Sequence, residues 1–366
     1  MIFCIRLSNK FYIESDTLMN RNLRYVENEM AYTNSTSLLA HTLDNGADDG
    51  VLLGFELYPG CNMKEVAGRY CPGCAITLRK ERDQDVLLET KDYLQCIDEC
   101  LTEGKLWGSF GGFGTLQGCT LVGDEVLWRD IVFQDRTLPI LKHLKKHSIP
   151  SAIVTNGFLL HERLHDLLDV DVDHITVSLD GVRADNDALR GGYEYVIDNL
   201  VKTHRALGKK LSIGSVVHPK RYRNLGPLLD VLKRFDIRTW TLSTFIDFKK
   251  GAQDIQYDKQ VLDYINELGK KARTQGIRVL FEYPKNEPVG FNVEVVRKPE
   301  SMNIYRLSHD GTVQTGTNLY EAINGNSSQW TPSEGSFKDI ARCAYQSHLR
   351  LAPRVAGSMG VYCSAI

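Results

Sequence analysis

The chain has 366 residues, of which 42% are apolar and 25% are charged, as is ordinary for a globular protein with a large core. Its 44 basic and 46 acidic residues nearly cancel, which excludes a bulk positive field that would recruit nucleic acid or an anionic membrane. No apolar run approaches the roughly 20 residues of a membrane span, and the first residues lack the pattern of a signal peptide. We therefore expect a cytoplasmic protein with neither a nucleic-acid nor a membrane partner.

In the reducing cytoplasm, the nine cysteines are expected to be metal ligands and buried thiols rather than disulfides. Residues 1–50 carry few signals and predict a short N-terminal elaboration that packs on the main domain. The first strong strand is expected at residues 51–57, where an apolar run empties into a cysteine-bearing loop.

Three cysteines in that loop predict a metal centre. Cys71 and Cys74 are separated by a proline and a glycine, a tight turn that places two sulfurs on one metal or cluster edge. Cys61 lies upstream, across nine intervening residues. Three thiolates leave one iron of a [4Fe–4S] cluster open to a ligand that is not protein. A redox Cys-x-x-Cys pair is one alternative, and a zinc site is another, with His165 or Cys119 as its fourth ligand.

After the cysteine loop, residues 87–101 have helical spacing, and Cys96 and Cys100 share a face as buried thiols. From residue 119 onward, strands and helices alternate. The further strands are expected at residues 119–125, 151–157, 174–181, 210–219, 238–247 and 277–283. The helices between them are expected at residues 137–147, 161–169, 195–207, 225–235 and 261–272, with Val196, Ile197, Leu200 and Val201 buried in the third of these.

Strands that are each followed by a helix predict parallel βα units. Six such strands, with a seventh candidate at 277–283, predict an α/β fold: a partial (β/α)6 TIM-like barrel. A doubly wound sheet is the rival, but no Gly-x-Gly-x-x-Gly unit supports dinucleotide binding. Polar residues gather at the C-terminal strand ends, where barrels form active sites: Cys61, Glu125, Thr155, Asn156, Ser178, Asp180 and His218.

Three segments carry a family resemblance beside the cysteines. They are VGDEVL at 122–127, SAIVTNGFLL at 151–160 and ITVSLDGVRADNDALRGG at 175–192. Over residues 51–246 the chain resembles the radical S-adenosylmethionine (radical SAM) superfamily, in its branch of SPASM and Twitch maturases. Two features depart from the usual pattern of that family. The C-x9-C-x2-C spacing is longer than usual, and Asp124 and Val126 replace a glycine and a proline of the strand-end motif.

The resemblance implies an enzyme in which Cys61, Cys71 and Cys74 hold one [4Fe–4S] cluster. That cluster cleaves S-adenosylmethionine (SAM) reductively to a 5′-deoxyadenosyl radical, which abstracts hydrogen from a substrate. The implied SAM contacts are Gly123, Asp124 and Glu125 for the amine, Asn156 and Ser178 for the ribose, and Arg190 for the carboxylate, which a guanidinium fork suits. An electron donor such as flavodoxin or ferredoxin is the implied protein partner.

Residues 301–326 resemble the strand-turn-strand that opens a SPASM or Twitch extension, but without its cysteines. The expected organisation is an N-terminal elaboration (1–50), a radical SAM partial barrel (51–285) and a small α+β extension without an auxiliary cluster (286–366). If a substrate radical needs a hydrogen donor, Cys119 and Cys363 are the candidates. The missing auxiliary cluster and the short N-terminal segment favour a small-molecule substrate, and maturation of a ribosomally made peptide is the alternative.

Overall fold

In a computed structural model of the chain, one sheet carries the fold. The structure describes residues 44, 50–58, 61–63, 68, 71, 88–102, 116–123, 125–128, 135–245, 257–282, 292–295, 302–316 and 327–329. Its strands are β1 (Gly50–Glu56), β2 (Leu116–Val122), β3 (Ser151–Thr155), β4 (His174–Ser178), β5 (Leu211–Val217), β6 (Thr239–Thr244), β7 (Arg278–Glu282), β8 (Glu294–Val295), β9 (Met302–Leu307), β10 (Thr312–Gly316) and β11 (Ser327–Gln329).

Helices follow most of these strands in the chain. They are α4 (Thr90–Thr102), α5 (Thr137–Lys146), α6 (Leu164–Asp169), α7 (Ala184–Leu189), α8 (Tyr193–Leu207), α9 (Leu228–Arg234) and α10 (Lys259–Thr274), with short 3₁₀ turns at Gly208–Lys210 and Tyr222–Leu225. None of the described helices combines the length and the hydrophobicity that a membrane-spanning helix needs.

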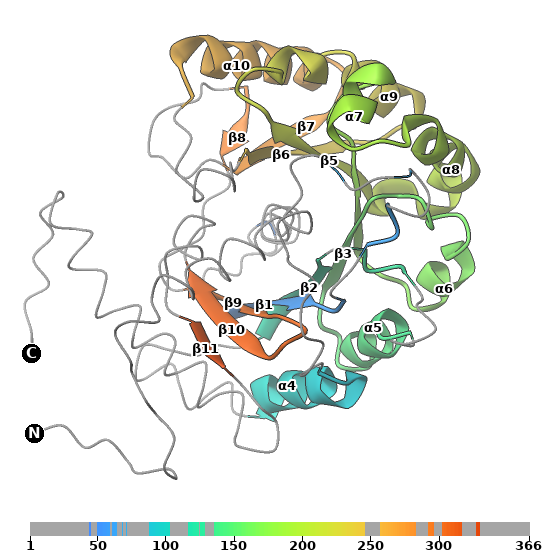
Figure 1. Ribbon diagram of the computed structural model, residues 1–366, viewed down its shortest axis with the longest axis vertical. Helices are drawn as coiled ribbons and strands as arrows, with labels where there is room; N and C mark the ends of the chain where they lie inside the picture. Colours follow the sequence, from blue (N-terminus) through green and yellow to red (C-terminus); the bar gives the residue numbers. More distant parts are fainter. Residues whose placement is uncertain are drawn as a thin grey trace, which may run out of the picture.

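The sheet is a partial barrel. Its order is β11-β10-β9-β1-β2-β3-β4-β5-β6-β7-β8, so its two ends do not pair with each other among the described residues. The neighbours from β1 to β8 are all parallel, as right-handed βα units require. Figure 1 shows the strands lining the inside of an arc and the helices covering its outside. The predicted partial α/β barrel is confirmed, and the seventh candidate strand is β7.

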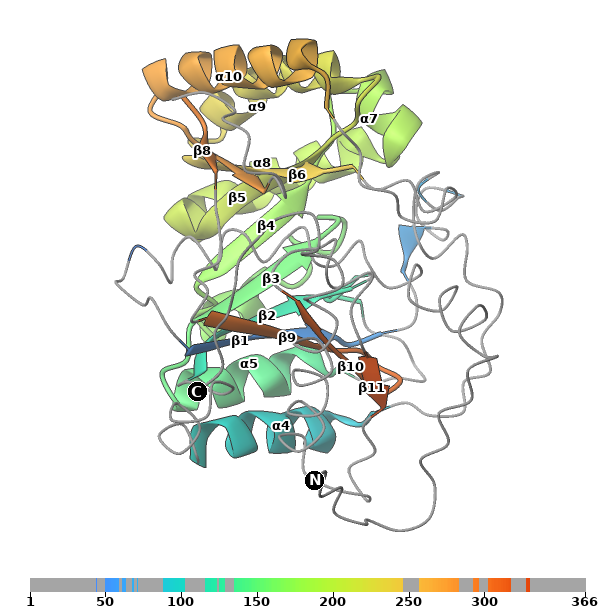
Figure 2. The same ribbon diagram turned by 90° about the vertical axis from the view of Figure 1, so that its left-hand side faces the viewer.

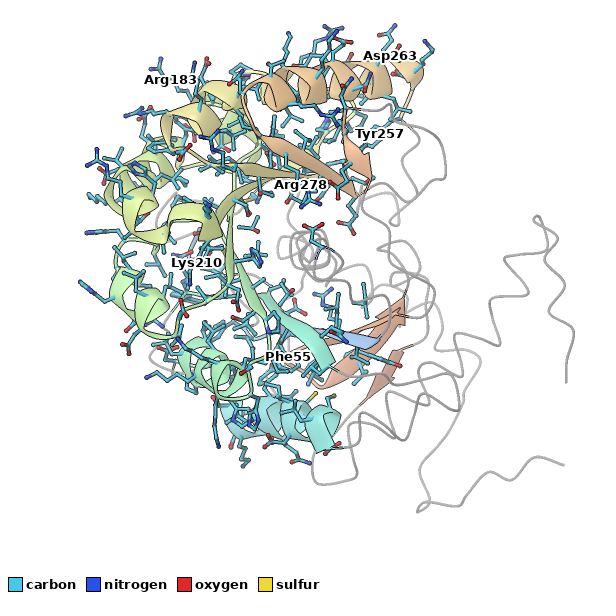
Figure 3. The ribbon with its side chains drawn as sticks, turned by 180° about the vertical axis from the view of Figure 1, so that it is seen from behind. Phe55, Arg183, Lys210, Tyr257, Asp263 and Arg278 are labelled. Carbon is cyan, nitrogen blue, oxygen red and sulfur yellow. The ribbon has the colours of Figure 1, made fainter. Side chains whose placement is uncertain are left out.

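The hydrophobic core lies between the strands and the helices. In register across the sheet, Phe55 pairs with Leu121, Leu121 with Ile153, and Ile153 with Ile175, and all four face the helices. Phe55 packs on Tyr93 of α4 with ring centroids 5.1 Å apart, whereas Arg183 and Asp263 lie on the outer, helical side (Figure 3). Alternation along each strand turns the intervening residues to the inner face.

The inner face of the sheet carries more buried polar side chains than its helical face, beside apolar ones such as Val122 and Val154. Its buried polar side chains are Glu56, Thr120, Thr176, Ser178, Ser212, Thr241, Ser243 and Arg306. Hydroxyls dominate this set, and a hydroxyl costs free energy in a core unless it is hydrogen-bonded. The main packing layer therefore lies on the helical side, and most of the buried hydroxyls and charges of the sheet lie on the inner side.

The C-terminal hairpin continues this sheet. The strand-turn-strand expected within 301–326 is β9 and β10, with the backbone N–H of Thr312 donating to the Asp310 carboxylate in the turn (3.0 Å). Strand β9 pairs parallel with β1, and β10 returns antiparallel. Figure 2 shows β9 beside β1 and β10 beyond it. The N-terminal elaboration falls almost wholly outside the described residues.

Two predictions about helices have clear outcomes. Cys96 and Cys100 of α4 are buried, as expected. Val201 was expected in the core, but it is 48% exposed. The buried stripe of α8 instead runs through Val196, Ile197 and Leu200, and Val201 lies about 100° around the helix from Leu200, on the solvent side.

Candidate functional site

The C-terminal ends of β1 to β5 meet at one edge of the sheet, which we call the rim. Cys61 follows β1, Glu125 follows β2, Asn156 follows β3, and Asp180 follows β4. Because parallel strands point the same way, these residues gather although up to 119 positions separate them in sequence. The rim also receives Arg190, which caps the C-terminus of α7.

Glu125 joins the ends of β2 and β3. Its side chain is fully buried. One carboxylate oxygen, Oε1, accepts from the hydroxyl of Thr155 (2.7 Å) and from the backbone N–H of Leu127 (3.1 Å). The other, Oε2, accepts from the backbone N–H of Asn156 (2.7 Å). Charge-assisted hydrogen bonds of this kind are the strong ones, so Glu125 fixes where Asn156 stands.

Asn156 connects the end of β3 to the cysteine loop. Its side-chain Nδ2 donates to Oδ1 of Asn62 at 2.8 Å, and lies 3.6 Å from the sulfur of Cys61. Its Oδ1 accepts from the backbone N–H of Phe158 (3.0 Å), which fixes the orientation of the amide. Cys61 therefore lies beside β3, with an N–H donor directed at its sulfur.

Arg190 is held by Asp180. The Arg190 Nε lies 2.6 Å from Oδ2 of Asp180, and the backbone N–H of Val216 donates to Oδ1 of the same carboxylate (2.7 Å). The Asp180 side chain is 7% exposed and the Arg190 side chain 19% exposed, so the pair is largely shielded from water. The thiol of Cys71 donates to the backbone carbonyl of Arg190 at 3.6 Å. A second cysteine of the loop thus lies at the end of α7.

Gly123, directly after β2, fits a position that excludes a side chain. Its φ of +111° is a conformation that L-residues rarely adopt, and a Cβ there would lie 2.8 Å from Cγ of Glu56. Glu56 in turn pairs with Arg306 of β9, with Nη2 2.9 Å from Oε2, and both side chains are 1% exposed. Ser178 lies on the same inner face at the end of β4, paired in register with Gly214.

Several candidate residues lie elsewhere or outside the described part of the chain. Cys74, Asp124 and Cys363 are among the residues that the structure does not describe. Cys119 is fully buried on the helical face of β2 beside Cys100, and burial raises the pKa of its thiol well above the ordinary value. That placement gives no support to the hydrogen-donor role, which stays a prediction.

The zinc alternative gains no support from the described residues. His165 is exposed on α6. Among the described residues, no group of three close metal-ligating side chains joins Cys61 or Cys71 with His165 or Cys119.

Three residues near the rim were not singled out in the sequence: Asn62, Glu56 and Arg306. Each carried a signal. Asn62 directly follows the first cysteine of the loop. Glu56 lies between Phe55 and Leu57, and Arg306 lies between Tyr305 and Leu307. A charge between apolar strand residues is seldom buried without a partner.

Comparisons with known proteins place the fold. No protein-family model and no curated protein sequence matches the chain. Streptococcus suis SuiB bound to its precursor peptide SuiA is 15% identical, with a TM-score of 0.54 over 93% of this chain and 73% of that one. SuiB bound to S-adenosylmethionine is 14% identical, with a TM-score of 0.52 over 82% and 68%. The protein anSMEcpe with AdoMet and a Cp18Cys peptide is 14% identical, with a TM-score of 0.51 over 81% and 83%. The chain therefore shares the fold of proteins whose structures hold S-adenosylmethionine.

Proposed function

We propose that the chain is a radical SAM enzyme. The observation that carries the proposal is the convergence of Cys61 and Cys71 on one rim, beside the Glu125–Asn156 and Asp180–Arg190 contacts. The fold that presents this rim is shared with SuiB and anSMEcpe, whose structures contain S-adenosylmethionine. Neither the fold nor the cysteines alone would identify the chemistry, because one fold serves many reactions.

In this proposal Cys61, Cys71 and Cys74 hold one [4Fe–4S] cluster. The donor set fits, because thiolate sulfur is the ligand such clusters take, and an N–H donor directed at a sulfur is one way a protein tunes them. The Asn156 amide is such a donor, 3.6 Å from the Cys61 sulfur. When bound and reduced, the cluster supplies the electron that cleaves S-adenosylmethionine to a 5′-deoxyadenosyl radical for hydrogen abstraction.

The remaining rim residues bind and orient S-adenosylmethionine. Gly123, Asp124 and Glu125 serve its amine, Asn156 and Ser178 its ribose, and Arg190 its carboxylate. The contacts of Glu125 with Thr155, Leu127 and Asn156 make it also a positioning residue for Asn156. Asp180 positions Arg190 by binding Nε, so that the guanidinium is oriented before the carboxylate arrives.

The substrate is a small molecule or a peptide, and one observation favours the peptide. Two of the structures that share this fold contain one: SuiB holds its precursor peptide SuiA, and anSMEcpe holds a Cp18Cys peptide. Peptide modification therefore stands as the second candidate beside the small-molecule reaction that the missing auxiliary cysteines favour. A flavodoxin or ferredoxin would deliver the electron.

Anaerobic reconstitution tests the proposal. The full chain should bind about four iron and four sulfide ions and form 5′-deoxyadenosine from SAM and dithionite. The Cys61→Ala, Cys71→Ala, Cys74→Ala triple variant should lose both properties. Cys100→Ala, which removes a buried thiol far from the rim, is the matched control and should keep them. Zinc in place of iron, or 5′-deoxyadenosine formation by the triple variant, would overturn the assignment.

A further inference from the structure

Two helices on the outside of the barrel bring together a group of metal-ligating side chains away from the rim. Asp98 lies on α4, His143 lies in the last turn of α5, and His147 directly follows α5. Helices α4 and α5 lie side by side on the helical layer, across the sheet from the polar inner face (Figure 1). The proposed radical chemistry makes no use of these three residues.

Both imidazoles approach the same carboxylate oxygen. The Nε2 of His143 lies 2.7 Å from Oδ1 of Asp98, and the Nε2 of His147 lies 4.0 Å from the same atom. One ligand atom from each residue can be chosen so that all lie within 4.8 Å of one another. The centroids of the two imidazole rings are 4.8 Å apart, and the ring planes are tilted by 60°, so the rings do not stack face to face.

The sequence spacing produces this convergence. Positions 143 and 147 are four apart, so they share one face of α5, and that face looks toward α4. A single His–Asp hydrogen bond would need only one histidine at this place. The second histidine turns its Nε2 to the same oxygen, which is the arrangement that a shared cation explains.

The donor set defines the class of ion. Two imidazole nitrogens and one carboxylate oxygen suit zinc and neighbouring divalent transition metals, and do not suit magnesium or calcium, which prefer oxygen. Three protein ligands leave a fourth, open position for water. The C-terminal end of α5 also carries the negative end of the helix dipole, which favours a cation there.

We propose that Asp98, His143 and His147 form a zinc-binding site that clamps α4 to α5. Solvent reaches it, because the three side chains are 56%, 17% and 32% exposed. Helix α4 follows the cysteine loop in sequence, and α5 precedes β3, which Asn156 directly follows. The bound ion ties together the two helices that flank β2, independently of whether the rim holds a cluster.

Zinc stoichiometry on the full chain tests the site. Reduced, chelator-treated protein is dialysed against buffered free zinc, and bound zinc is measured by mass spectrometry. The His143→Ala, His147→Ala double variant should bind one zinc fewer per chain than the parent protein. Zinc bound by the thiols cancels in this difference. The control, His161→Ala, removes an exposed histidine of another segment and should bind as the parent does.

Asp98→Asn provides a milder second variant, which keeps the shape of the side chain and should weaken zinc binding at this site at least tenfold.

Substitution of cobalt for zinc identifies the ligand atoms. The parent-minus-variant spectrum should show weak visible bands of a nitrogen and oxygen site, without the intense thiolate band near the ultraviolet. Equal zinc content in the parent and in a double variant with an unchanged circular dichroism spectrum would overturn the proposal. So would a thiolate band in the difference spectrum.

Discussion

At the scale of single residues, Glu125 shows how one carboxylate organises the rim. Its two oxygens accept three hydrogen bonds, from Thr155, Leu127 and Asn156. Glu125→Gln replaces one acceptor with an NH₂ group that would face a donor. We expect the free energy of unfolding to fall by about 2 kcal/mol, because a buried donor is left unpaired. Denaturant unfolding measures this loss.

The same variant should weaken SAM binding at least tenfold in equilibrium dialysis, since Asn156 loses its anchor. Glu99→Gln provides the control, because Glu99 is a partly exposed carboxylate on α4 that accepts a hydrogen bond from the side chain of Gln95. If Glu125→Gln binds SAM as tightly as the parent protein does, Glu125 neither contacts SAM nor positions a residue that does.

The burial of Cys119 predicts how the free energy of unfolding depends on pH. Burial raises the pKa of its thiol well above the ordinary value in the folded state, so the folded protein holds this proton more tightly than the unfolded chain. Its contribution to stability is complete below the unfolded pKa of about 8.5 and is lost as pH rises above it. Between pH 7.5 and 9.5, we expect one such thiol to cost about 1 kcal/mol of unfolding free energy.

Urea unfolding in reductant at the two pH values measures that loss. The Cys119→Ala variant is less stable at both values, but it should lose less stability between them than the parent protein does. An identical pH dependence in both proteins would mean that the folded state tolerates the thiolate at this position.

At the scale of elements, the pair of Glu56 and Arg306 attaches β9 to β1. Nη2 of Arg306 lies 2.9 Å from the carboxylate, and both side chains are 1% exposed. Removing one partner takes this ion pair away from the buried charge that remains. We expect Glu56→Leu or Arg306→Met alone to cost about 3–5 kcal/mol in denaturant unfolding. The Glu56→Leu, Arg306→Met double variant should cost much less, because it leaves neither charge alone. Additive losses in this double-mutant cycle would show that the two charges do not interact.

The strands and helices were predictable because their signals are local. The run SAIVTNG predicts a strand that ends in polar residues, and β3 ends at Thr155 as that pattern indicates. The error at Val201 is local too. The apolar stripe of a helix is about 100° wide, and Val201 lies beyond the edge of the buried stripe of α8. The rim positions of Cys61 and Asn156 follow from strand order alone.

Contacts within the rim could not be predicted in the same way. Nothing local in the sequence shows that Asp180 holds the Nε of Arg190, or that Asn156 donates to Asn62. These contacts depend on the end of α7 returning to β4 and on the cysteine loop reaching β3. A long loop can close in many ways for similar entropy, so its partners are set by the folded structure rather than by spacing.

At the scale of the whole molecule, repetition of βα units predicted an open barrel, and the C-terminal hairpin shows the limit of that prediction. Strand β9 adds to the free edge of β1 across about 250 residues of sequence. The hairpin itself was predictable from its turn, because Asp310 and Gly311 favour one. Its pairing with β1 joins strands that are far apart in sequence, so no local signal predicts it. The buried pair of Glu56 and Arg306 supports this pairing.

Because the rim collects residues from successive strands, SAM binding should stabilise the molecule as a whole. A ligand present at 100 times its Kd adds about 2.7 kcal/mol to the unfolding free energy. For a chain of this length, that raises Tm by about 3 °C. Arg190→Gln should remove most of the shift at the same SAM concentration. Arg183→Gln, an exposed arginine of the same segment, should keep it. Differential scanning calorimetry measures both. Equal shifts in the two variants would place the SAM carboxylate away from Arg190, and the absence of any shift in the parent protein would contradict SAM binding at the rim.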